Sequence, residues 1–85
     1  MLGWQAQYQA IAEFKEAIRV SPDYAEAYYD LGIARDGTGQ TDEAIREFQE
    51  AIRLKPGFAV AKMSLRSALL RRRHEGGAPG NQGSN

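Results

Sequence analysis

The fold is decided by a ten-residue sequence that occurs twice, as AIAEFKEAIR at residues 10–19 and as AIREFQEAIR at residues 44–53. Pro22 follows the first copy and Pro56 follows the second, so the prolines recur with the same period as the two copies. In both copies the apolar residues recur at intervals of three and four, the spacing of one face of an α-helix. The period, about 34 residues, is typical of stacked helical hairpins. The sequence therefore predicts an all-α fold of antiparallel helical hairpins.

The apolar spacing predicts four helices, over residues 4–20, 24–36, 42–54 and 58–74. Pro22 and Pro56 separate the hairpins, because proline lacks the N–H that a helix interior needs and restricts the residue before it.

Polar and flexible residues predict where the middle helices begin and end. Asp23, with Glu26 three residues later, is expected to cap the second helix, and Thr41 is expected to cap the third. Gly37 and Gly39 predict the turn between these helices, because glycine supplies the backbone freedom that closes a hairpin.

The composition indicates one small domain without covalent cross-links. The chain has 85 residues, no cysteine, and 11 acidic residues balanced by 11 basic ones. The zero formal net charge argues against attraction of the whole molecule to nucleic acid or to an anionic membrane. No apolar run approaches the roughly 20 residues that span a bilayer, and the first residues do not resemble a signal peptide. We therefore expect a cytoplasmic protein.

The last residues differ from the rest of the chain. Residues 75–85 are rich in glycine and contain no apolar side chain larger than alanine or proline. Such a segment cannot recover its ordering entropy by burial. We expect a helical domain over residues 1–74 and a disordered tail over residues 75–85.

The residues within one period also match a known helical repeat. The sequence resembles the tetratricopeptide repeat (TPR) family, whose pattern is Trp-x-x-Leu-Gly-x-x-Tyr, then Ala-x-x-x-Phe, then Pro. The resemblance implies a right-handed stack of hairpins that acts as a protein-binding scaffold and has no catalytic activity. One repeat is read in Tyr28, Leu31, Gly32, Ala44, Phe48, Ala51 and Pro56, and half of another in Ala10, Phe14, Ala17 and Pro22.

The side chains at the matched positions have a packing reason. Gly32, Ala44 and Ala51 are small enough for paired helices to approach closely, and Phe48 fills the space between hairpins. The fourth predicted helix departs from the pattern, since Lys62 and Arg66 stand where an aromatic residue and a glycine are usual. It resembles a polar-faced capping helix after about one and a half repeats.

In the register of the repeat, one face of the first predicted helix would normally pack against a preceding helix. We expect a second copy of the chain to cover it in a twofold homodimer. The alternative is that the chain is a fragment of a longer TPR protein whose preceding helix covers this face. The face carries Ala10, Phe14 and Ala17, and Trp4 and Tyr8 extend it.

The resemblance also implies a concave face, formed by the first helix of each hairpin, that receives a protein or peptide partner. The apolar residues of this face indicate contact with another protein. The alternative is that they line an intramolecular or dimer interface. Asp30, Val60 and Ser64 replace the amide and basic residues of the family's carboxylate clamps, so no clamp is expected. By position the face has Glu26, Tyr29, Asp30 and Ile33 from the second helix, and Val60, Met63, Ser64, Ser67 and Leu70 from the fourth.

The basic cluster Arg71-Arg72-Arg73, with Arg66 before it, admits a weak nucleic-acid contact as an alternative function. No stacking aromatic lies near the cluster, so a solvated helix end is the favoured interpretation and no nucleic-acid partner is expected. His74 is the single histidine, and no catalytic triad, phosphate loop or metal-ligand spacing is present in the sequence. We expect no enzyme activity, no cofactor and no metal.

Overall fold

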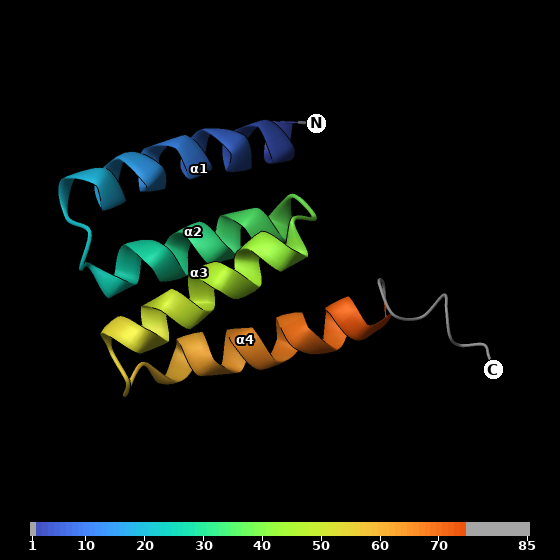
Figure 1. Cartoon of the computed structure of the whole chain (residues 1–85). Coiled ribbons are helices and arrows are strands. Elements are labelled where there is room, and N and C mark those ends of the chain that lie inside the picture. The colour runs from blue at the N-terminus through green and yellow to red at the C-terminus, as the bar shows by residue number, and fades with distance from the viewer. Residues whose placement is uncertain (1, 75–85) are drawn as a thin grey trace.

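Four helices follow one another in the computed structural model, which describes residues 2–74 and the side chains of residues 5–74. They are α1 (Leu2–Val20), α2 (Ala25–Gly37), α3 (Thr41–Leu54) and α4 (Ala59–Arg72). Each helix runs antiparallel to the one before it, and the order in space follows the order in the chain (Figure 1). The described residues form helices and turns without a strand, so the predicted all-α fold of four helices is confirmed. The predicted tail lies outside the described residues.

The residue at the N-cap position of α2 lies one position later than predicted. Pro22 and Asp23 occupy the middle of a turn that the Tyr24 N–H closes on the Ser21 carbonyl at 3.1 Å. Asp23 is therefore too early to cap α2, and Tyr24 holds that position without a side-chain hydrogen bond. The same turn recurs one period later, where the Phe58 N–H bonds the Lys55 carbonyl at 2.9 Å.

The turn between α2 and α3 forms at Gly39, whereas Gly37, the other glycine predicted for it, is the last residue of α2. Gly39 has φ = 82°, a left-handed conformation that favours glycine. Thr38 and Gln40 hold the turn, since Thr38 Oγ1 donates to the Arg35 carbonyl at 2.9 Å and Gln40 Nε2 donates to Thr38 Oγ1 at 2.6 Å. The predicted cap at Thr41 is wrong by one residue, because Gln40 precedes the helix and Thr41 is already its first residue.

Two apolar clusters hold the stack together. One joins α1 to α2 through Ile11, Leu31 and Ala34, with Ala10, Phe14 and Ile18 packed against it. The other joins α3 to its neighbours through Ala44, Ile45, Phe48 and Ala68, with Tyr29 and Leu65 packed against it. The Phe48 side chain is fully buried, so it is the centre of the stack.

The repeated sequence has different surroundings at its two occurrences. Ala44, Phe48 and Ala51 are each 0% exposed in α3, which has α2 on one side and α4 on the other. Their equivalents in α1, Ala10, Phe14 and Ala17, are only half-buried, because α1 packs on α2 alone among the described helices.

Candidate protein-interaction surfaces

The two helices that were predicted to form a concave face, α2 and α4, lie next to each other. A shallow open hollow of about 400 Å³ lies between them. Ile33 and Met63 are the apolar residues at its surface, 45% and 66% exposed. The lining residues are Ile33, Asp36, Met63, Ser64, Ser67 and Arg71. We call this the α2–α4 hollow.

An ion pair joins the two helices at this hollow. The Arg71 guanidinium donates to the Asp36 carboxylate, and both groups are partly buried. The sequence predicts a solvated helix end at Arg71 and does not identify Asp36 as its partner. The repeat does contain a signal for this pair. Residues one period apart lie side by side on α2 and α4, and Arg71 follows Asp36 by one period plus one residue.

The structure brings together four of the nine residues predicted for the concave face, since the α2–α4 hollow is lined by Ile33, Met63, Ser64 and Ser67. Tyr29 is half-buried instead, with its ring 5.9 Å from that of Phe48 and 5.3 Å from that of Phe58. Tyr29 is therefore part of the packing between hairpins and lies outside the hollow.

The two predicted acidic residues, Glu26 and Asp30, do not line this hollow. Glu26 pairs with Lys55 at 2.8 Å, and this hydrogen bond lowers the pKa of the Glu26 carboxyl. Asp30 is half-buried, so desolvation raises its pKa, and the nearby Glu26 adds to the effect. Glu26 is thus already paired within the chain, whereas Asp30 is half-buried outside the hollow.

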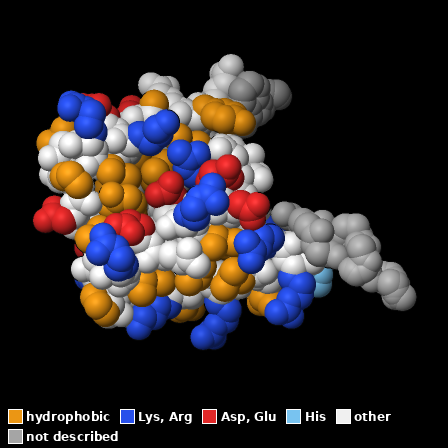
Figure 2. Space-filling model, in the orientation of Figure 1, with side chains coloured by type: hydrophobic (Ala, Val, Ile, Leu, Met, Phe, Trp, Pro, Cys, Tyr) orange, Lys and Arg blue, Asp and Glu red, His pale blue; other side chains and the backbone are white. Residues whose placement is uncertain are grey.

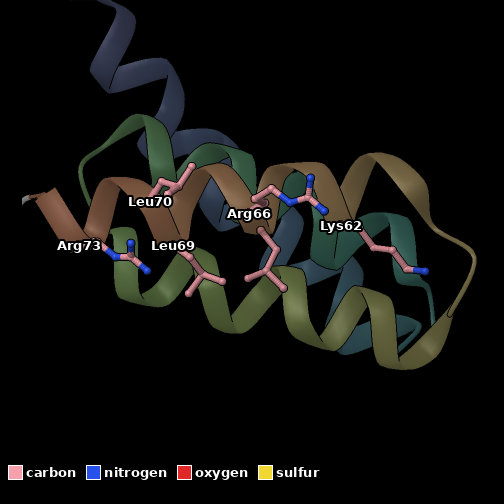
Figure 3. A pocket seen from close by; sticks show the side chains of 6 residues that line it. Lys62, Arg66, Leu69, Leu70 and Arg73 are labelled. Carbon is pink, nitrogen blue, oxygen red and sulfur yellow. The ribbon is translucent and has the colours of Figure 1, made fainter.

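A second hollow, of about 390 Å³, lies on the outer face of α4. It combines leucines with cations, and it takes in Leu70, which the sequence had assigned to the concave face (Figure 3). In Figure 2 the lower edge, which α4 forms, shows Lys, Arg and hydrophobic side chains, with no acidic side chain of a described residue among them. The lining residues are Lys62, Leu65, Arg66, Leu69, Leu70 and Arg73. We call this the outer α4 face.

The residues predicted for self-association lie on α1. Tyr8 is half exposed, and Phe14 is half-buried against the cluster of Ile11, Leu31 and Ala34. The side chain of Trp4 lies outside the described side chains. The α1 surface is thus less apolar than expected at Phe14, which packs partly on its own chain.

The C-terminal arginines do not act as one cluster. Arg71 pairs with Asp36, and Arg72 Nη1 lies 3.5 Å from Asp42 Oδ1. Arg73 lines the outer α4 face. This division weakens the nucleic-acid alternative, which needs a continuous basic surface.

The described residues contain no group of three or more His, Asp or Glu side chains placed to hold a metal ion. No helix among them has the length and apolar character needed to cross a membrane.

Comparison with protein families agrees with the packing. A model described as TPR repeat matches residues 7–35, and a model described as tetratricopeptide repeat matches residues 25–58. The two matches together run from α1 to the start of α4 and include both copies of the repeated sequence. Comparison with curated proteins gives no match.

Proposed function

Because the chain belongs to the tetratricopeptide repeat family, whose repeats mediate protein–protein interaction, we propose that it binds a segment of another protein in the α2–α4 hollow. One observation carries the proposal. Ile33 and Met63 expose apolar surface from two neighbouring helices beside the hydroxyls of Ser64 and Ser67. An apolar anchor with polar groups around it is the usual composition of a recognition site.

The hollow also favours a particular kind of segment. The carboxylate of Asp36 and the guanidinium of Arg71 already neutralise each other at the hollow. A partner therefore gains little from carrying net charge there, and it gains most by burying an apolar side chain between Ile33 and Met63. Methionine suits such a surface because its flexible side chain adapts to different shapes.

The experiment selects peptides from a random library displayed on phage against the full chain and measures binding by fluorescence polarisation. We expect Met63→Glu to weaken binding at least roughly tenfold, about 1.4 kcal/mol, because it places a charge where an apolar anchor must be buried. Val20→Glu is the matched control, since Val20 is also 66% exposed but lies at the end of α1.

Two results would contradict this site. The first is selected peptides that bind Met63→Glu as tightly as the natural chain. The second is an equal loss with Met63→Glu and Val20→Glu, which would indicate a general effect of added negative charge. Circular dichroism spectra of both variants establish that they keep the helical fold.

We also propose that the chain self-associates through α1. The support is the contrast between Ala10, Phe14 and Ala17, which are half-buried, and their equivalents in α3, which are fully buried between α2 and α4. A second copy would give α1 the second neighbour that α3 already has.

The proposed activity is binding without catalysis. His74 is exposed, follows the end of α4, and has arginines at the three positions before it. The acidic residues at the start of α3, Asp42 and Glu43, lie where negative charge stabilises a helix N-terminus, which accounts for them without a catalytic role.

A further inference from the structure

The outer α4 face has cations without a counter-charge. Lys62, Arg66 and Arg73 line it, and none of them forms an ion pair with a described residue. The neighbouring Arg71 and Arg72 do find carboxylates, at Asp36 and Asp42. The positive charge of the outer α4 face is therefore left for something outside the described part of the chain.

The cations surround apolar surface that is open to solvent. Leu69 and Leu70 are 38% and 49% exposed, and Leu65 lies half-buried beside them. In Figure 3 the Lys62, Arg66 and Arg73 side chains extend from the same helix as Leu69 and Leu70. Leucines bordered by flexible cations fit an apolar surface bordered by carboxylates.

In the repeat, this face is equivalent to a surface of α2 that packs against a helix. A shift of one period places Lys62, Leu65, Arg66 and Leu69 where α2 has Tyr28, Leu31, Gly32 and Arg35. On α2 that region packs against α3, with Gly32 next to the Phe48 ring. The equivalent surface of α4 is thus built to receive a helix that runs alongside it.

Arg66 decides which helix fits. A Cβ atom at Gly32 would lie 2.6 Å from Phe48 Cε1, so that position tolerates a close aromatic ring only as glycine. Arg66 therefore disfavours the equally close approach of a phenylalanine, as α3 makes with Phe48 and as α1 would make with its equivalent, Phe14. The α1 helix of a second copy is a poor occupant for the same reason. A helix with a small residue opposite Arg66 has no such clash.

We propose that the outer α4 face binds an acidic amphipathic helix of another protein. Its apolar stripe covers Leu65 and Leu69, and its carboxylates pair with Lys62, Arg66 and Arg73. This site is distinct from the α2–α4 hollow, so either can exist without the other.

The test titrates the full chain into two labelled synthetic peptides and follows fluorescence polarisation. Both peptides are helical, with a stripe of leucine and alanine. One carries glutamate on both sides of the stripe, and the other carries lysine at the same positions. We expect the glutamate peptide to bind and the lysine peptide not to bind. Binding should weaken with added salt, because exposed charges are screened within roughly 8 Å at physiological ionic strength.

Variants locate the contact. We expect Arg66→Glu to weaken binding of the glutamate peptide by roughly tenfold or more, because it replaces attraction with repulsion. Arg46→Glu is the matched control, since it changes the net charge equally from an exposed position on α3. Leu69→Ser should also weaken binding, and Met63→Glu in the α2–α4 hollow should leave it within roughly twofold.

Several outcomes would overturn the proposal. Equal losses with Arg66→Glu and Arg46→Glu would mean non-specific charge attraction. Tighter binding to phosphatidylserine vesicles or to a single-stranded oligonucleotide, lost in Arg66→Glu, would assign the face to a membrane or a nucleic acid. A concentration-dependent increase in mass that Leu69→Ser abolishes would assign it to a second copy. A loss with Met63→Glu alone would place the acidic helix in the α2–α4 hollow.

Discussion

At the scale of single residues, one close contact in the stack joins a glycine to a phenylalanine. Gly32 lies directly against Phe48, which is fully buried and therefore has no free space into which to move. The need for small residues at Gly32, Ala44 and Ala51 was predictable from the repeat, and burial of all three confirms it. The reason is steric, since a β-carbon at Gly32 would separate α2 from α3.

Gly32→Ala is expected to destabilise the protein. The added methyl group overpacks the Phe48 ring, which costs about 1–3 kcal/mol, and the better helix propensity of alanine returns only about 0.5–1 kcal/mol. Gly57→Ala is the control, because nothing lies within 4 Å of a Cβ there, and we expect a change within about 0.5 kcal/mol. Urea unfolding followed by circular dichroism measures both.

The Phe48→Leu variant tests whether contact with the Phe48 ring causes the loss of stability in Gly32→Ala. In Phe48→Leu chains the smaller side chain leaves room beside residue 32, so the loss caused by Gly32→Ala should shrink. A loss of the same size in both backgrounds would show that the contact with Phe48 is not responsible.

At the scale of elements, the helices were more predictable than their ends. Apolar spacing located all four helices, because their burial is periodic. It did not locate the start of α2, because a preceding turn competes for the same residues. Pro22 and Asp23 form the middle of that turn, and so the helix begins later than the capping pattern suggested.

At the junction between α2 and α3, burial of the Glu47 side chain opposes ionisation of its carboxyl group. Arg35 Nε lies 3.4 Å from Glu47 Oε2, but Arg35 Nε makes no hydrogen bond. Burial raises the pKa of Glu47, and the attraction of Arg35 only partly offsets that rise. The native state therefore keeps this proton to higher pH than the unfolded chain does. The stability contributed by the protonated Glu47 carboxyl is complete below the pKa of Glu47 in the unfolded chain. It is lost as pH rises through the pKa of Glu47 in the folded chain.

Glu47→Gln removes this titration, so the variant should gain stability relative to the natural chain between about pH 4 and about pH 7. Glu50→Gln should lose stability relative to the natural chain over the same pH range, and by a smaller amount. The reason is that the hydrogen bond from Arg53 lowers the pKa of the exposed Glu50. Urea unfolding at both pH values measures the free energies. A relative loss for Glu47→Gln on going to neutral pH would mean that Arg35 outweighs burial.

At the scale of the whole molecule, the stack has two unlike ends. The α1 end exposes small apolar residues and part of Phe14, whereas the α4 end exposes leucines among cations. The register of the repeat predicted Ile33, Met63 and Ser67 at one surface, because helices in equivalent positions lie side by side. It could not predict the position of Leu70, because this depends on how far α4 is rotated against α2.

The unlike ends make the mode of self-association testable. If α1 pairs with α1 of a second copy, the assembly closes as a twofold dimer and leaves both outer α4 faces open. One helix face is a small interface, so the mass measured by light scattering should rise from monomer to dimer with concentration. Ala17→Glu should hold the chain as a monomer, because it places a charge in that interface. Arg19→Glu, an exposed position on α1, should leave the dimer intact. A monomer at every concentration would refute self-association, and a dimer unaffected by Ala17→Glu would refute the α1 interface.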